Sequence, residues 1–388
     1  MTELLNTLYV QTQGASLHLD HDSLKIVIPE TPKRTLPLRR LDGIVVYGHV
    51  SLSAELLARC ADDGRSVVWM SLSGRFLGRV DGPTRGNVLL RHAQHLSHAA
   101  PDLRLQIARS CVAGKLQNSR QLLLRGARDA TTPAQASLRS LAQDIDDLLA
   151  RAGDAGNLDE LMGLEGQAAR LYFEGLAQML RIPSDIAPFS NRTRRPPTDP
   201  VNALLSFLYG LTRALVHGAA EQVGLDPYLG FLHGMRPGKP ALALDLMEEF
   251  RPFHADRLAL NLLNRKQLSK EHFETLPGGA VQLTEDGRRL VLTEWQAWKN
   301  KDWPHKLLGR KVSASLLPVV QSRLLAATSA VSCLVTSPGR SADAAAPDVR
   351  RGDHHTGGSP SAAADGQAVR GIWLSRPEVG VRDHLHGR

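Results

Sequence analysis

Four side chains spread over the sequence could hold a divalent metal ion. Glu165 occurs in GLEGQAARLYF, His233 in YLGFLHGMRPGKP, and Asp245 and Glu248 in ALALDLMEEFRP. Carboxylates and an imidazole form a mixed oxygen and nitrogen donor set, which suits Mg²⁺ or Mn²⁺ better than a metal that requires thiolates. If a carboxylate, the imidazole and a second carboxylate are the protein ligands, positions stay open on the metal for water or a phosphate oxygen. We therefore expect metal-assisted chemistry at a phosphate.

Glu165 is predicted to lie in the apolar stripe of a helix. Its neighbours at helical spacing include Leu161, Ala168 and Tyr172. An ionised carboxylate there needs a cation or hydrogen-bond donors, because burying it unpaired costs on the order of several kcal/mol. A metal ion could supply the charge, and so could a Lys or Arg from another helix. The helix geometry alone favours the second interpretation.

His233 follows the apolar run YLGFL and precedes a loop rich in Gly and Pro. We expect its ring to project from a helix end into a crevice, although a histidine alone at such a place usually serves as a hydrogen-bonding residue. Asp245 and Glu248 are three residues apart and face one side of a predicted helix. Glu249 points away and is expected to be solvated or paired with Arg251.

The first 80 residues have the period of strands. Short β-branched or aromatic runs are separated by Gly, Asp or Pro turns: TLYVQT, SLHLD, LKIVI, GIVVYG, SVVWM and RFLGRV. One helix interrupts them over 53–64, with Ser53 as its N-cap and Gly64 as its stop. We predict an α+β protein whose residues 1–86 form a small β-rich domain.

After about residue 87 the apolar residues recur at three and four, which predicts a mostly α-helical domain over 87–328. Its later helices are expected near 200–223, 243–264 and 311–327, with one hairpin that turns on Asp286-Gly287. Residues 329–388 are small, polar and rich in Gly and Pro, which indicates a disordered tail.

Composition limits the function classes. The chain has 388 residues, a formal net charge of +8 and a pI near 9.6, which favours an anionic partner without separating DNA, RNA and a membrane surface. Three widely spaced cysteines leave no disulfide framework and no CxxC zinc site. No phosphate loop, GxSxG nucleophile turn or HExxH occurs. We expect a cytoplasmic protein without a membrane span.

Four stretches together resemble the CRISPR-associated spacer-integration endonuclease, and more narrowly its type I-C branch. They are LLNTLYVQTQGASLHLD, GLEGQAARLYF, NRTRRPPTDPVNALLSFLYG and DPYLGFLHGMRPGKPALALDLMEEFRP. The likeness runs from about residue 4 to 325. After QSRLLAATSA the sequence departs from the family pattern, which places full activity of this chain in question.

The resemblance implies a site and a reaction. The family's metal ligands match Glu165, His233 and Glu248. Asp245 matches an acidic position close to the metal, and Asn202 and Tyr209 match positions that line the active-site region. These three residues are expected to position the site rather than to ligate the metal. In the implied reaction, the 3′ hydroxyl of a DNA fragment attacks a phosphodiester of the CRISPR repeat, assisted by Mg²⁺ or Mn²⁺.

Double-stranded DNA is the implied partner. Basic residues expected at phosphates are Arg170, Arg192, Arg194, Arg195, Arg265 and Lys266, with Arg85 and Arg91 as further candidates. The resemblance also implies a homodimer formed through the N-terminal domains, a small bridging protein that completes a heterohexamer, and an iron-sulfur trimming nuclease. Two alternatives stay open: a non-catalytic DNA-binding scaffold, and a nuclease that acts on branched DNA in repair.

Overall fold

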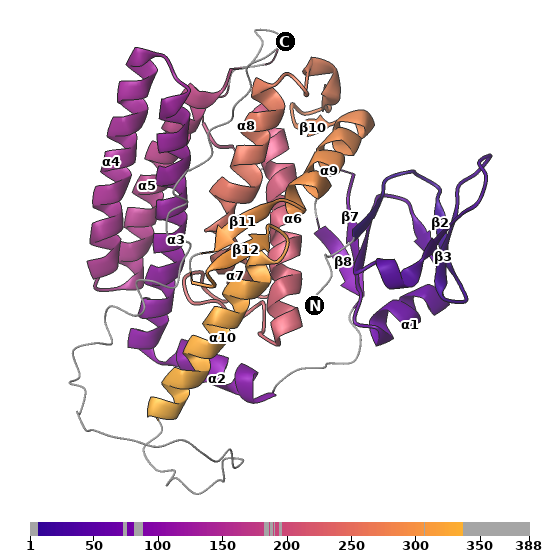
Figure 1. The fold of residues 1–388 in the computed structure, drawn as a ribbon, viewed down its shortest axis with the longest axis horizontal. Coiled ribbons are helices and arrows are strands. Elements are labelled where there is room, and N and C mark those ends of the chain that lie inside the picture. Colours follow the sequence, from indigo (N-terminus) through magenta and orange to yellow (C-terminus); the bar gives the residue numbers. More distant parts are fainter. Residues whose placement is uncertain are drawn as a thin grey trace, which may run out of the picture.

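The computed structural model describes residues 7–72, 76–80, 88–181, 186, 189, 191–193, 196–305 and 307–336. A β-rich N-terminal domain lies beside a larger helical domain (Figure 1). The predicted α+β class is therefore confirmed. The last 52 residues, 337–388, which include most of the predicted tail, lie outside the described residues.

The N-terminal domain contains two four-stranded sheets. One has the order β1-β5-β7-β8, in which β8 alone runs antiparallel to its neighbour, and the other has the order β4-β3-β2-β6. The strands are β1 (Thr7–Val10), β2 (Ser16–Asp20), β3 (Ser23–Val27), β4 (Arg34–Pro37), β5 (Gly43–Tyr47), β6 (Ser51–Leu52), β7 (Ser66–Met70) and β8 (Phe76–Val80). The six predicted strands are present; β4 and β6 are too short and polar to show a period of two.

The alternation along β5 joins the two domains. Ile44 and Val46 are buried in the core of the N-terminal domain, whereas Val45 and Tyr47 belong to the core of the helical domain, where the Tyr47 ring stacks on Phe207. Helix α1 (Ala54–Asp62) packs between β2 and β7. As predicted, Ser53 caps it, accepting a hydrogen bond from the amide of Leu56.

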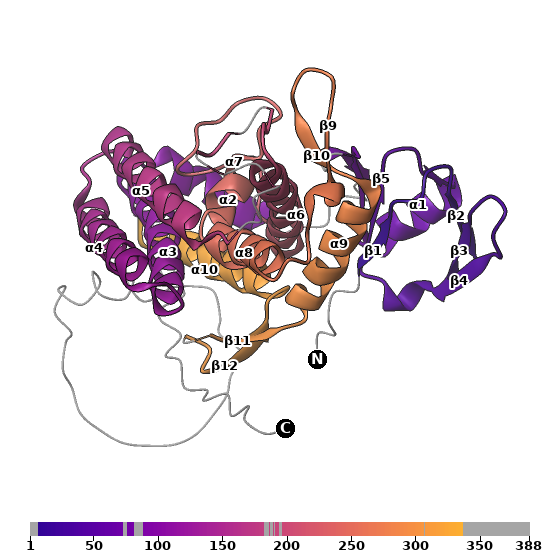
Figure 2. The same cartoon turned by 90° about the horizontal axis from the view of Figure 1, so that it is seen from above.

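The helical domain is built from long amphipathic helices. Helices α3, α4 and α5 form a three-helix layer on one side, and α6 lies at the centre (Figures 1 and 2). The helices are α2 (Val88–Ala99), α3 (Pro101–Arg128), α4 (Thr132–Asp154), α5 (Leu158–Met179), α6 (Pro200–Val223), α7 (Ala241–Met247), α8 (Arg257–Asn264), α9 (Glu285–Lys299) and α10 (Leu317–Thr336). Short 3₁₀ turns occur at Leu38–Arg40 and Lys270–His272.

The helix predicted over 243–264 is interrupted. A π-helical turn, Arg251–Asp256, separates α7 from α8. Pro252 has no amide hydrogen to donate to the preceding turn, so a continuous α-helix is disfavoured there. The break places Glu248 and Arg251 at the junction of two elements, and π-helical turns occur frequently at functional sites.

The hairpin predicted at Asp286-Gly287 is wrong. These residues lie in the first turn of α9, where the Thr284 hydroxyl accepts a hydrogen bond from the amide of Gly287 at 3.3 Å. The strand β10 (Val281–Leu283) pairs with β9 (Phe273–Thr275), which precedes it. Gly287 is required for close packing rather than for a turn, because a Cβ there would lie 2.4 Å from the carbonyl oxygen of His272.

The helix predicted over 311–327 begins later than expected. Residues 310–313 form β12 (Arg310–Ser313), which pairs with β11 (Asp302–His305), and α10 follows.

Helix α6 is long and apolar enough to cross a membrane, but 56% of its most apolar window is buried inside the protein. It packs against α7, α8 and α10. The core helix of a soluble protein passes the same test, so this is weak evidence for a span.

Replacing Gly287 with alanine tests the close packing of α9. We expect the free energy of unfolding to fall by about 1–3 kcal/mol, because the new methyl group meets backbone that cannot move alone. Urea denaturation measures the change. The control is Gly153→Ala in α4, where no atom lies within 4 Å of the added Cβ. Equal stability of the two variants would contradict the assignment.

Candidate active site

His233 is held by a buried carboxylate in the second half of α7. Its Nδ1 lies 2.6 Å from Oδ1 of Asp245, whose side chain is fully buried. A carboxylate can only accept, so Nδ1 carries the proton in this contact, and in the neutral ring Nε2 has the free lone pair. Nε2 makes no hydrogen bond within the described part of the chain, and 30% of the His233 side chain is exposed. This is the orientation in which an imidazole is prepared to ligate a metal.

The loop that carries His233 is fixed by backbone groups and by α2. The carboxylate of Asp245 also accepts hydrogen bonds from the backbone amides of Phe231, Leu232 and His233. Gln94 in α2 bonds to backbone groups of Asp226 and Leu229. His233 therefore projects from this rigid loop and not from a helix end as predicted.

Gly230 lets the loop approach α7 closely. A Cβ at this position would lie 2.7 Å from Oδ2 of Asp245 and 2.8 Å from the Cβ of Ala241. The carbonyl oxygen of Gly230 accepts a hydrogen bond from Nδ1 of His98 at 2.7 Å, and that of Phe231 accepts one from Arg104 at 3.0 Å. None of these supporting contacts could be read from one sequence.

Lys115 links the two remaining candidate ligands. Its ammonium, on α3, forms ion pairs with Oε1 of Glu165 in α5 and with Oε2 of Glu248, the latter at 2.7 Å. Lys115 is 8% exposed, and Glu248 is 3% exposed. The salt bridge that the helix geometry favoured for Glu165 is therefore present, and its partner also contacts the second carboxylate.

Glu248 is held ionised by two cations. Burial would raise the pKa of its carboxyl, but Arg251, with Nη1 3.1 Å from Oε1, and Lys115 outweigh burial and lower this pKa to about 2. The Lys115 ammonium contacts Oε2 of Glu248, and Arg251 contacts Oε1, so each oxygen of this carboxylate has a cationic partner.

Glu249 was predicted to be solvated or paired with Arg251, and both predictions are wrong. Glu249 is 1% exposed, and Nε2 of Gln321 lies 3.4 Å from its Oε2. Burial raises the pKa of Glu249 well above its ordinary value. Because α7 ends at Met247 and a π-helical turn follows, the chain direction changes here, and Arg251 faces Glu248 instead.

Tyr209 lies between two guanidinium groups. Arg192 and Arg251 lie 5.2 and 5.0 Å from the centre of its ring, and its hydroxyl donates to Asp256 at 2.7 Å. Tyr172 donates to the other oxygen of Asp256 at 2.5 Å. Burial raises the pKa of the Asp256 carboxyl to about 6, although both hydroxyls oppose this. Tyr209 thus reaches Glu248 through Arg251, without contacting it directly.

Asn202 anchors the basic loop. Its Oδ1 accepts from the guanidinium of Arg192 at 2.7 Å and from the amide of Thr193 at 3.0 Å, and its Nδ2 donates to the carbonyl oxygen of Asn191. Arg192 also donates to Ser206. Arg192 therefore has structural partners, while Arg85, Arg194 and Arg195 lie outside the described residues.

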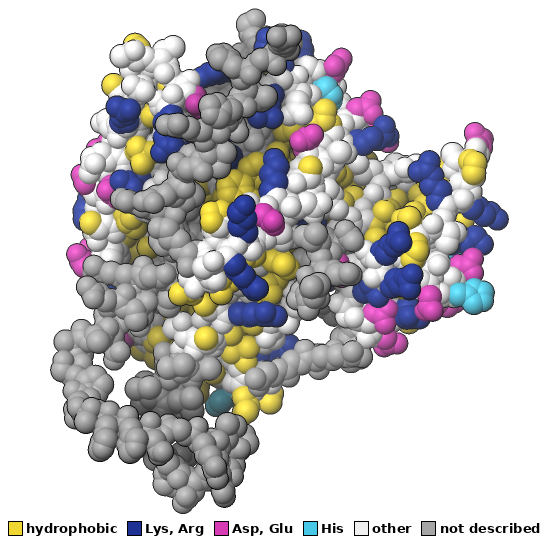
Figure 3. Space-filling model, viewed as in Figure 1, with side chains coloured by type: hydrophobic (Ala, Val, Ile, Leu, Met, Phe, Trp, Pro, Cys, Tyr) yellow, Lys and Arg dark blue, Asp and Glu magenta, His cyan; other side chains and the backbone are white. Residues whose placement is uncertain are grey.

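The other predicted phosphate contacts lie apart from one another. Arg170 on α5 is exposed, as are Arg265 and Lys266 after α8, and Arg91 on α2 is half-buried. Figure 3 shows a line of Lys and Arg side chains down the middle of one face of the helical domain. Arg310 and Lys311 in the β11–β12 hairpin are also exposed, and neither was among the predicted phosphate contacts.

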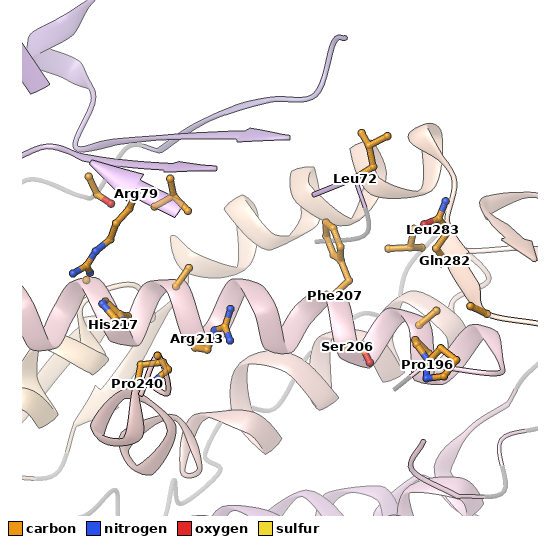
Figure 4. Close-up of a pocket in the computed structure, with 18 of the residues that line it drawn as sticks. Leu72, Arg79, Pro196, Ser206, Phe207, Arg213, His217, Pro240, Gln282 and Leu283 are labelled. Carbon is orange, nitrogen blue, oxygen red and sulfur yellow. The ribbon is translucent and has the colours of Figure 1, made fainter. Parts of the chain in front are cut away.

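A cavity of about 840 Å³ lies between α6 and the N-terminal sheet. Figure 4 shows Arg79 from β8 reaching toward the helix, near His217. Glu221 pairs with Arg79 and with His217 in this region. None of the residues that line this cavity is a predicted metal ligand, so the volume and the candidate chemistry are in different places.

The donor types fit a hard divalent cation. Two carboxylates share one cationic centre, the Lys115 ammonium, and carboxylate oxygens are the ligands that hard divalent cations prefer. Across the residues that the structure describes, however, no three His, Cys, Asp or Glu side chains lie close enough together to hold a metal ion as they stand. Lys115 would have to give up its position.

Comparison with known proteins gives the family. The sequence profile described as CRISPR associated protein Cas1 matches residues 8–297. This chain belongs to the Cas1 family. A CRISPR-associated endonuclease Cas1 from Moorella thermoacetica is 45% identical over 83% of this chain and 94% of its own length. A second, from Rhodospirillum rubrum, is 43% identical over 84% of this chain and 95% of its own length.

A third relative, also from Rhodospirillum rubrum, is named a CRISPR-associated exonuclease Cas4/endonuclease Cas1 fusion. It is 35% identical over 82% of this chain and 55% of its own length. None of these names bears on the type I-C branch, which stays a prediction.

Solved structures share the Cas1 fold. A Cas1 protein from Thermotoga maritima superimposes with a TM-score of 0.72 at 24% identity, covering 84% of this chain and 97% of that one. A casposase bound to integration product gives 0.73 at 24% identity, covering 84% and 91%. A chain of a Cas6-RT-Cas1–Cas2 complex gives 0.73 at 22% identity, covering 86% and 36%.

The raised pKa of Asp256 predicts a pH dependence of stability. Because the native carboxyl has a pKa near 6 against an ordinary value of 3.8, the folded state binds the proton more tightly, and the resulting stabilisation is lost as pH rises through 6. As the pH falls from about 7.5 to about 5, protonation of Asp256 should raise the free energy of unfolding by about 1 kcal/mol.

Urea denaturation of the wild type and of Asp256→Asn at both pH values measures this contribution. Relative to Asp256→Asn, the wild type should have a higher free energy of unfolding at pH 5 than it has at pH 7.5. A difference that does not change with pH would contradict the assignment.

Proposed function

We propose that this Cas1 protein is a metal-dependent DNA integrase and endonuclease that inserts DNA fragments into a CRISPR array. The observation that carries the proposal is the meeting of Glu165 and Glu248 at one buried cationic point, in a chain of the Cas1 family. His233, oriented by Asp245, supplies the third donor. Relatives named as endonucleases and a casposase with the same fold support this reading.

Glu165, His233 and Glu248 would hold Mg²⁺ or Mn²⁺. When bound, the ion would polarise a phosphate and stabilise charge on its oxygens. Asp245 keeps the lone pair of the His233 Nε2 available, and Arg251 keeps Glu248 ionised. Tyr209 and Asn202 act through Arg251 and Arg192, so they position the site without serving as ligands.

The reaction joins a 3′ hydroxyl to a repeat phosphodiester. The attacking oxygen forms a bond to phosphorus, and the bond to the leaving 3′ oxygen of the repeat strand breaks. The attacking hydroxyl gives its proton to solvent, and the leaving oxygen takes a proton from solvent to become a new 3′ hydroxyl. No bond to a protein side chain is needed. The number of phosphodiester bonds is conserved, so no external energy source is required.

DNA and protein partners follow from the same proposal. A net charge of +8 and exposed cations such as Arg170, Arg265 and Lys266 suit a DNA backbone. The fusion of a relative to Cas4 and the fold shared with a Cas1–Cas2 assembly support a trimming nuclease and a small bridging protein as partners. We also propose a homodimer and a cytoplasmic location.

Two other functions use the same fold. A non-catalytic scaffold would bind DNA without joining it, and a repair nuclease would cut branched DNA without joining fragments. The donor set around Glu165 favours a catalyst over the scaffold. A supercoiled repeat plasmid, a fragment with free 3′ hydroxyls and Mn²⁺ separate the three, because only an integrase joins fragment to plasmid.

Replacing Glu165 with glutamine should lower the rate of strand transfer by at least about 100-fold, since a neutral amide is a poor ligand for a hard cation. His233→Ala should have a similar effect. A gel assay of labelled fragment incorporated into the plasmid measures the rate. The matched control is Glu174→Gln, an exposed position on the same helix, which should keep the wild-type rate. Full activity of Glu165→Gln would refute the site.

The basic surface predicts a salt dependence. Alanine at Arg170, Arg265 or Lys266 should reduce the slope of log affinity against log salt by about 0.9 for each lost phosphate contact. Fluorescence anisotropy measures the affinity for a DNA duplex at several salt concentrations, from about 50 to about 200 mM. The slope is read from these affinities. Arg59→Ala, in an ion pair on α1, is the control. An unchanged slope in all three variants would remove these residues from the interface.

A further inference from the structure

Lys115 occupies the point at which the two candidate carboxylate ligands meet. Its ammonium contacts Glu165 and lies 2.7 Å from Glu248, and its side chain is 10% exposed. It comes from the same face of α3 as Cys111, one turn earlier, and Asn118, one turn later; Asn118 donates to the carbonyl oxygen of Glu249. The stem of Lys115 is therefore fixed by a helix that packs directly on α7.

The charges of the four residues Lys115, Arg251, Glu165 and Glu248 sum to zero without any ion. Lys115 and Arg251 carry two positive charges, and Glu165 and Glu248 carry two negative charges. Asp245 adds a negative charge that three backbone amides and His233 stabilise. A divalent cation on the two carboxylates would leave the four-residue cluster with two excess positive charges in a mostly buried place, which is costly unless an anion enters.

We propose that Lys115 is a positioning residue that couples metal binding to DNA binding. In the protein without DNA, its ammonium competes with a divalent ion for Glu165 and Glu248. When a DNA phosphate enters, Lys115 exchanges its two carboxylate partners for the phosphate, and the carboxylates become free to ligate the ion. DNA therefore raises the affinity for metal, and by thermodynamic reciprocity metal raises the affinity for DNA.

This inference rests on the proposed metal site, and metal affinity tests it without an activity assay. Free Mn²⁺ is measured by its electron paramagnetic resonance signal, with and without a duplex whose 3′ ends are dideoxy, so that no strand transfer occurs. The duplex should lower the Kd of the wild type for Mn²⁺ by about tenfold, within the range of about 5- to 150-fold typical of coupled sites.

Lys115→Met should bind Mn²⁺ about tenfold more tightly than the wild type without DNA, because the competing cation is gone, and added duplex should change its Kd by less than about threefold. Lys115→Arg keeps a cation and should not bind more tightly than the wild type. The control is Arg120→Met. Arg120 lies on α3, as Lys115 does, but it pairs with Asp146 of α4 and not with a candidate ligand. The Kd of this variant for Mn²⁺ should equal that of the wild type.

The outcomes separate the inference from the proposed function. If Glu165→Gln does not weaken Mn²⁺ binding, the proposed metal site fails, and the inference with it. If Glu165→Gln weakens binding but Lys115→Met does not tighten it, the inference alone is overturned. If Lys115→Met does not fold, the wild type decides. A Kd for Mn²⁺ that the duplex leaves unchanged overturns the coupling. A Kd that the duplex lowers, together with no tighter binding of Mn²⁺ by Lys115→Arg, supports the coupling.

Discussion

The ion pairs from Lys115 to Glu165 and Glu248 are the contact on which the candidate site depends. They join α3, α5 and the end of α7 at one point, where Lys115 and Glu248 are buried and the Glu165 side chain is 24% exposed. Removing one partner would leave an uncompensated buried charge, which costs on the order of 3–5 kcal/mol. The same contact helps to keep Glu248 ionised and holds both carboxylates in reach of a cation.

The rest of the domain holds that point in place. Helix α2 fixes the loop of His233 through Gln94, and Asp245 fixes the ring itself. The π-helical turn after α7 brings Arg251 onto Glu248 and carries the chain on to Asp256, which binds the hydroxyls of two tyrosines. Stability and chemistry are thus connected here, because the groups that neutralise the site also join its helices.

Local patterns predicted the parts of the fold that depend on neighbours in sequence. The six strands, the N-cap at Ser53 and the long helices follow from periods of two and 3.6. The Asp286-Gly287 hairpin failed because the same residues also form a capped helix start, and only packing against His272 decides between them. Glu165 was expected to need a cation, but the identity of that cation, 50 residues away on α3, has no local signal.

We propose that Glu165, His233 and Glu248 hold one divalent ion at the place where Lys115 now meets the two carboxylates. A crystal structure of the protein soaked with Mn²⁺ tests it most directly, through the anomalous signal of the metal. We expect one peak about 2–2.6 Å from an oxygen of each glutamate and from Nε2 of His233, with the Lys115 ammonium displaced. A peak elsewhere, with Lys115 still bound to both glutamates, would contradict it.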